Sequence, residues 1–168
     1  MPTLVRARNL LLLPLLTLAV LAAVTALSPV ADASAVTRSQ KSSQRVTVKI
    51  NRAASIALHQ IGDPYRYGSA GPNSFDCSGL MQFSFRRAGI SIPRTAAAQA
   101  HRARHIPRNK MRRGDLMFFT GGGGIYHAAM FLKWSKGHVV MLHAPRTGQR
   151  VKIDRPWTNS WFAATMRR

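Results

Sequence analysis

The chain has 168 residues, among them 25 lysines and arginines against 5 acidic residues, and its formal net charge at pH 7 is +20. This length suits one domain of ordinary size with an extension at one end. The single cysteine excludes an internal disulfide. The positive charge predicts an anionic partner, for which nucleic acid, anionic lipid and anionic cell-wall polymer all qualify, with general solvation of the surface as the alternative.

The N-terminal segment has the three parts of a secretory signal peptide. Arg6 and Arg8 lie in a short stretch without acidic residues, an almost uninterrupted apolar run follows, and "ADASA" supplies small residues where a signal peptidase reads the chain. We therefore predict a signal peptide over residues 1–33, with cleavage after Ala33 and with Ala35 as the second choice.

An uncleaved membrane anchor is the alternative for this segment, because the apolar run has about the length that spans a bilayer. Pro14 and the small-residue site favour cleavage. The absence of a cysteine near the site excludes a lipoprotein anchor. Export predicts a secreted protein and argues against nucleic acid as its partner.

The first half of the remaining chain has helical patterns. Residues 34–50 are polar, basic and rich in serine, which predicts a linker or mobile arm. The apolar spacing of "NRAASIALHQI" predicts a helix with Asn51 as its N-cap, ended by Gly62 and Pro64. After a loop rich in glycine and proline, "CSGLMQFSFRRAG" resumes a helical pattern, and "TAAAQAHRAR" predicts another short helix.

The second half has the pattern of strands. After Gly114, the apolar or alternating runs "DLMFF", "YHAAMFL", "HVVMLHA" and "RVKI" are separated by "GGGG", "KWSKG" and "PRTGQ". This is typical of a meander of antiparallel strands, which "WFAATMRR" is predicted to close. Helices followed by strands predict an α+β fold, with N-terminal helices packed on a C-terminal antiparallel sheet, in a domain over residues 51–168.

Cys77 follows the turn-rich loop and opens a predicted helix. Free backbone N–H groups and the helix dipole at that position favour a thiolate, and the same N–H groups can donate to an oxyanion that forms beside the sulfur. Ser78 and Gly79 are small, so a substrate carbonyl has room to approach. The alternative is a buried, inert cysteine.

Two histidines on neighbouring predicted strands offer the base that a thiol nucleophile needs. His127 begins one strand and His143 ends the next, so antiparallel pairing brings them to the same end of the hairpin. One imidazole can act as base while the other fixes its tautomer. Exposed histidines at strand ends are the alternative.

His101 and His105 have the spacing with which a helix can chelate a metal. No third ligand is obvious and the segment is rich in arginine, so we predict a solvated surface there and no metal site.

Five blocks in order resemble the NlpC/P60 family of cell-wall cysteine peptidases: "GDPYRYGSAGPNSFDCSGL", "PRTAAAQ", "RRGDLMFF", "HAAMFL" and "MLHAPRTG". The resemblance covers about residues 51–168. It implies a compact papain-like fold and hydrolysis of peptide bonds in peptidoglycan stem peptides, commonly the bond between D-Glu and a diamino acid. It implies no cofactor, and peptidoglycan as the substrate.

Carried over by position, the resemblance implies that Cys77 is the nucleophile, His127 the general base and His143 the orienting third member. Tyr65 matches the family tyrosine whose hydroxyl lies near the thiolate. Asp76 and Ser78 match positions that line the substrate site. Arg94 and Gln99 also match family positions, with a structural role as an equal alternative, and we expect Asp115 to shape the turn before the first strand.

Competing functions remain open on the sequence alone. The same cysteine chemistry serves an amidase that cuts between muramic acid and L-alanine, and a thioester can also be passed to an amine by an acyltransferase. The non-enzymatic alternative is an inactive, basic protein that binds the cell wall. We expect a monomer, located at the cell wall and held there through its positive charge.

Overall fold

The computed structural model describes residues 30–167, so the predicted signal peptide lies almost wholly outside the described residues. Three helices and a short 3-10 helix (Arg108–Lys110) accompany six strands. The helices are α1 (Val30–Leu58), α2 (Cys77–Arg87) and α3 (Ala96–Arg102). The strands are β1 (Arg104–Ile106), β2 (Leu116–Gly121), β3 (Gly124–Ser135), β4 (His138–His143), β5 (Lys152–Asp154) and β6 (Trp161–Thr165).

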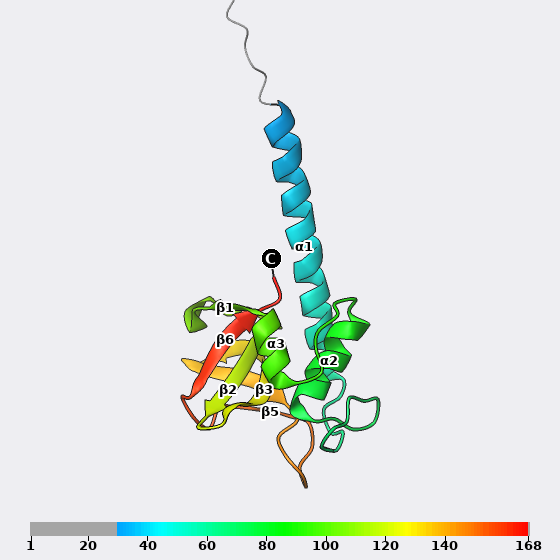
Figure 1. Cartoon of the computed structure of the whole chain (residues 1–168), viewed down its shortest axis with the longest axis vertical. Helices are drawn as coiled ribbons and strands as arrows, with labels where there is room; N and C mark the ends of the chain where they lie inside the picture. Colours follow the sequence, from blue (N-terminus) through cyan, green and yellow to red (C-terminus); the bar gives the residue numbers. More distant parts are fainter. Residues whose placement is uncertain (1–29, 168) are drawn as a thin grey trace, which may run out of the picture.

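The six strands form one antiparallel sheet in the order β1-β6-β2-β3-β4-β5. The predicted α+β fold, with helices packed on an antiparallel sheet, is confirmed (Figure 1). The sheet differs from a simple meander in two ways. β1, which the sequence did not predict, forms one edge, and β6 lies between β1 and β2.

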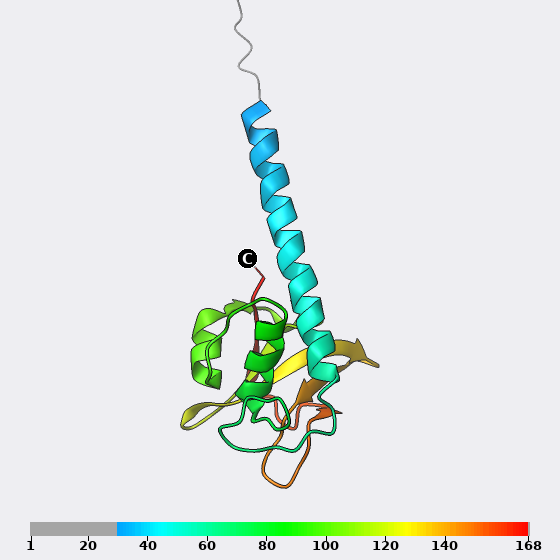
Figure 2. The ribbon, with the colours of Figure 1, turned by 90° about the vertical axis from the view of Figure 1, so that its right-hand side faces the viewer.

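Helix α1 differs from its predicted extent, because it begins at Val30 rather than after Asn51 and includes the predicted linker at 34–50. Neither glycine nor proline interrupts residues 30–61, so the polar segment continues the helix that packing stabilises further along. Among the residues of α1 whose burial is described (35–58), the fully buried ones lie toward the C-terminal end and are Ile50 and three alanines that follow it. The remainder extends away from the domain in both views (Figures 1 and 2).

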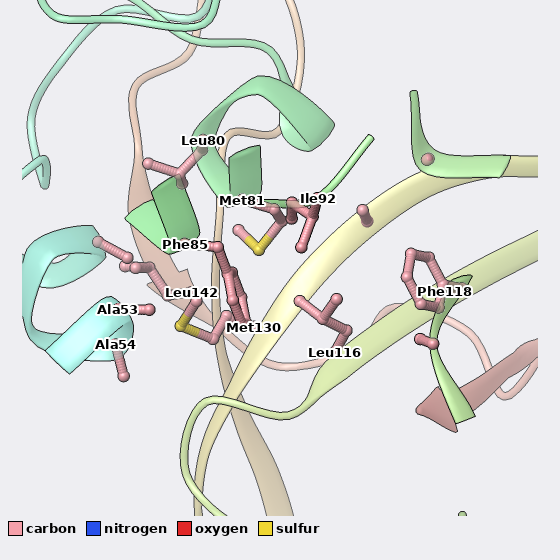
Figure 3. Packing of buried hydrophobic residues seen from close by; sticks show 14 of the residues in the cluster. Ala53, Ala54, Leu80, Met81, Phe85, Ile92, Leu116, Phe118, Met130 and Leu142 are labelled. Atoms are coloured by element: carbon pink, nitrogen blue, oxygen red, sulfur yellow. The ribbon is translucent and has the colours of Figure 1, made fainter. Parts of the chain in front are cut away.

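The main core lies between the helices and one face of the sheet (Figure 3). Leu116 and Phe118 of β2 belong to this core, whereas the alternate residues Met117 and Phe119 belong to a second buried cluster. Because successive side chains of a strand point to opposite faces, the two clusters lie on opposite faces of the sheet. Both faces of the central strands therefore carry buried side chains.

The hairpin of β3 and β4 turns more tightly than predicted. β3 continues through Trp134 to Ser135, and only Lys136 and Gly137 form the connection, both with positive φ. Two such residues are what a type I′ turn requires. Within the described part of the chain, no helix has the length and apolar character needed to cross a membrane.

Candidate active site

Cys77 is the first residue of α2, and the local sequence fixes this position. The Asp76 side chain caps the helix, with Oδ1 accepting a hydrogen bond of 2.7 Å from the backbone N–H of Gly79. A capping carboxylate satisfies one of the free N–H groups of the first turn. The predicted helix start is confirmed, and the half-buried cysteine is the free thiol of the described chain.

The capping carboxylate of Asp76 also forms an ion pair with Arg94, whose Nη2 lies 2.5 Å from Oδ2. Ser78 Oγ donates to Asp76 Oδ1 at 3.2 Å, and Gln99 Nε2 donates to the Ser78 carbonyl at 2.8 Å. Burial raises the pKa of Asp76, but hydrogen bonds from Arg94 and Gly79 outweigh it and hold the pKa below its ordinary value. Arg94 and Gln99 therefore have structural contacts that hold the start of α2.

The two histidines meet as their strands predict. His127 Nε2 lies 2.9 Å from His143 Nδ1, and both residues are buried. The rings are nearly perpendicular, with an interplanar angle of 87°. Because the contact uses Nε2 of His127, the Nδ1 atom of that ring is left for another partner.

A pocket of about 470 Å³ brings the thiol and the histidines together. Its lining includes Cys77, His127, His143 and Tyr65. Asp76 and Ser78 are buried and are not among the lining residues, so their role in substrate binding stays a prediction. Burial raises the pKa of Tyr65, which keeps its hydroxyl protonated and able to donate a hydrogen bond.

The pocket also contains residues that sequence reasoning did not identify. Trp157 stacks on Phe119 at 4.5 Å between ring centroids and contacts both His127 and His143. Its segment has no regular structure, so no periodicity marked it. The other lining residues that were missed are Tyr126, Pro145, Arg146, Gln149, Lys152 and Asp154. For Lys152 and Asp154 a signal existed, because they alternate on the strand that follows the one ending in His143.

The pKa values of the cysteine and the histidines are shifted in the directions that favour their neutral forms. Burial raises the pKa of Cys77, and the N–H groups of Ala128, Ser78 and Cys77 itself only partly oppose it. Burial and the neighbouring His143 lower the pKa of His127 to about 3, and burial lowers that of His143 to about 4. These directions favour the neutral forms of the Cys77 thiol and the His127 imidazole, whereas the helix dipole favours the thiolate, so the thiolate stays a prediction.

His101 and His105 lie on different elements, so they do not form a chelating pair on one helix. His101 belongs to α3, whereas His105 belongs to β1 and its ring lies 4.3 Å from that of Phe162. Both histidines are exposed, which confirms the predicted solvated surface.

Comparison with known proteins gives a match between residues 62–168 and the NlpC/P60 family. The gamma-D-glutamyl-L-lysine dipeptidyl-peptidase of Bacillus subtilis (strain 168) is 40% identical over 96 residues, which are 55% of this chain and 31% of that protein. The chain thus spans less than a third of that relative's length.

Two solved structures have a similar fold. The P60 domain of the M. avium subspecies paratuberculosis antigen MAP1204 is 31% identical, with a TM-score of 0.62 over 73% of this chain and 97% of that one. RipD from Mycobacterium tuberculosis, described as a non-catalytic NlpC/p60 domain protein, is 23% identical, with a TM-score of 0.59 over 70% and 97% of the two chains. The second likeness concerns the fold alone.

Proposed function

Because the chain belongs to the NlpC/P60 family, which is a family of cysteine peptidases, we propose that it is a secreted cysteine endopeptidase that hydrolyses peptidoglycan stem peptides. The bond between D-Glu and a diamino acid is the proposed site of cleavage. The observation that carries the proposal is the convergence of Cys77, His127 and His143 in one pocket. No cofactor is needed for this chemistry.

In the proposed mechanism, Cys77 attacks the carbonyl carbon of the scissile amide. Since His127 Nε2 contacts His143, the Nδ1 atom of His127 takes the thiol proton as the carbon–sulfur bond forms. The backbone N–H of Cys77 and the hydroxyl of Tyr65 stabilise the oxyanion. His127 then protonates the leaving amine, and a water that His127 activates hydrolyses the thioester and releases the acyl group.

The neutral resting pair gives this mechanism a defined starting point. The opposed shifts in the pKa values of Cys77 and His127 favour thiol and imidazole over an ion pair. We propose that the proton passes from Cys77 to His127 as the carbon–sulfur bond forms, which leaves an imidazolium beside the oxyanion. The two groups titrate as one coupled unit.

We also propose that α1 holds the enzyme at anionic cell-wall polymers. No acidic residue lies between Asp32 and Asp63. Basic residues recur along the helix at spacings of three or four, which places them on one side of it over about 21 Å. These residues are Arg38, Lys41, Arg45, Lys49 and Arg52.

A second cavity of about 470 Å³ continues this basic face onto the domain. Lys49 lines it together with Arg102 and Arg104, and with Arg167, which is buried and paired with Asp115. The sequence indicated bases scattered over the surface. In the structure, bases of α1 and of neighbouring elements instead gather along one helix face and around the adjoining cavity. We define the five basic residues of α1, with the exposed Arg102 and Arg104, as the basic face.

The test of the proposed activity compares the purified protein with Cys77→Ala on purified peptidoglycan, with released fragments identified by mass spectrometry. Fragments cut within the stem peptide, absent for the variant, are expected. Fragments that have lost the sugar-linked alanine would instead establish the amidase. Equal release by both proteins would exclude the nucleophile, and wall binding without any release would favour the non-enzymatic alternative.

A further inference from the structure

His143 has one ring nitrogen in a hydrogen bond and one that is buried without a partner. Its Nδ1 lies 2.9 Å from His127 Nε2, and its Nε2 has no hydrogen-bond partner among the described residues. The carboxylate oxygen Oδ2 of Asp154 lies 3.8 Å from that Nε2. Buried polar atoms usually have partners, so an unpaired one beside a carboxylate needs an explanation.

The contact between the two histidines allows two arrangements of protons, and only one of them suits catalysis. If His143 Nδ1 donates, His127 Nε2 accepts, and the Nδ1 atom of His127 then carries the proton and is no base. If His127 Nε2 donates, His143 Nδ1 accepts, and the Nδ1 atom of His127 has a free lone pair for the thiol proton. A neutral His143 in the second arrangement carries its proton on Nε2.

The Asp154 carboxylate distinguishes these arrangements because an ionised carboxylate only accepts hydrogen bonds. It faces a bare lone pair of His143 Nε2 in the first arrangement and an N–H in the second. Lys152 Nζ lies 2.8 Å from the same Oδ2, and the N–H of Arg155 donates to Oδ1 at 2.8 Å. Burial raises the pKa of Asp154, but hydrogen bonds from Lys152 and from the N–H of Arg155 outweigh it and hold the pKa below its ordinary value, so the group is a carboxylate at neutral pH.

We propose that Asp154 is a positioning residue that acts through His143 and selects the tautomer in which His127 is the base. This inference rests on the proposed function of the Cys77–His127–His143 group. The separation of 3.8 Å is longer than a direct hydrogen bond, but the Asp154 side chain is 40% exposed and has room to rotate toward the ring. The oxygen can accept from both Lys152 and His143, because it has two lone pairs.

The first test reads the tautomer in the resting protein and needs no substrate. Long-range proton–nitrogen spectra of protein labelled with ¹⁵N-histidine distinguish a protonated Nε2 from a protonated Nδ1. We expect His143 and His127 to carry their protons on Nε2, and Asp154→Asn to reduce this preference, because an amide can either accept or donate. A wild-type His143 protonated on Nδ1 would overturn the proposal, as would spectra unchanged by the substitution.

The second test measures hydrolysis. Asp154→Asn should lower kcat roughly 10- to 100-fold, as supporting partners of catalytic imidazoles do, with KM changed less than about twofold. Asp154→Glu should restore much of kcat, since it keeps the carboxylate, and Asp63→Asn is the control with the same loss of charge. A change confined to KM, or no rescue by glutamate, would contradict the proposal. Activity retained by Cys77→Ala would refute the proposed function and leave the spectroscopic result standing.

Discussion

His127 on β3 and His143 on β4 are both buried, and burial is the largest cause of the lowered pKa of each imidazole. A histidine that stays neutral when folded but takes up a proton near pH 6.5 when unfolded makes stability depend on pH. Above about pH 6.5 both states are neutral and no penalty exists. As the pH falls below that value, the unfolded state binds protons that the folded state does not, so stability is lost.

At the residue scale, we therefore predict that lowering the pH from 7 to 5 decreases the free energy of unfolding by about 2 kcal/mol for each of His127 and His143. Urea titrations of the wild type at the two pH values measure the total. In His127→Gln the difference between the two pH values should shrink by about half. An undiminished difference in this variant would mean that the buried imidazole is not the source.

Some residues of the site were predicted from the sequence, and others became evident only in the structure. Cys77 and its two histidines lie in contiguous motifs, and antiparallel pairing of the two strands already predicted that the histidines meet. Trp157 belongs to an irregular segment, where no pattern indicates which way a side chain points. Asp154 was visible as a residue of a strand, but its approach to His143 depends on the pairing of β4 with β5.

Helix α2 crosses the preceding loop so closely that residue 79 has no space for a side chain. A methyl group there would lie 2.1 Å from the carbonyl oxygen of Ser69 and 3.0 Å from the Cα of Ala70. Both neighbours are backbone atoms, which cannot move aside by rotating a side chain. The glycine is thus explained by packing of the helix on the loop, rather than by the approach of a substrate.

At the element scale, we predict that Gly79→Ala destabilises the protein by about 1–3 kcal/mol and also lowers activity, because the start of α2 carries the nucleophile. Gly122→Ala is the matched control, since a methyl group there meets nothing within 4 Å. Thermal unfolding and hydrolysis of peptidoglycan provide the two measurements. Equal stability of both variants would contradict the prediction and would show that the loop at Ser69 and Ala70 can move to accommodate the methyl group.

Prediction of the elements succeeded where hydrophobic periodicity was strong and failed where it was weak. Helix α2 and the strands from β2 to β6 follow clear patterns of apolar residues. β1 has three residues with two exposed side chains, so its pairing with β6 leaves no mark in the sequence. The polar half of α1 resembles a linker in composition, and only the absence of glycine and proline indicated a continuous helix.

Over the whole molecule, few acidic residues are available to offset the positive charge. Of the four acidic residues after Asp32, three form ion pairs within the domain: Asp76 with Arg94, Asp115 with Arg167, and Asp154 with Lys152. Each pair neutralises one base as well as one acid and leaves the net charge unchanged, but the bases of α1 lie in a segment without acidic residues after Asp32.

We predict at this scale that replacing Arg38, Lys41 and Arg45 with glutamine weakens sedimentation with purified cell walls in low salt. The control replaces Lys110, Lys133 and Lys136, which removes the same charge from other elements. Attraction between exposed charges is screened by salt, so the difference should vanish near 1 M. If both triple variants lose binding equally, net charge rather than the helix face is responsible.

The position of β6 between β1 and β2 has a consequence for the order of folding. β6 at residues 161–165 joins β1 to β2 and so to the rest of the sheet. It lies far along the chain from β1 at residues 104–106. Until those residues emerge, β1 and β2 have no partner between them, and the contacts that close the sheet are distant in sequence. Such pairings form late. Closure of the sheet therefore depends on residues 161–165, and we expect it to be slow because its contacts are distant in sequence.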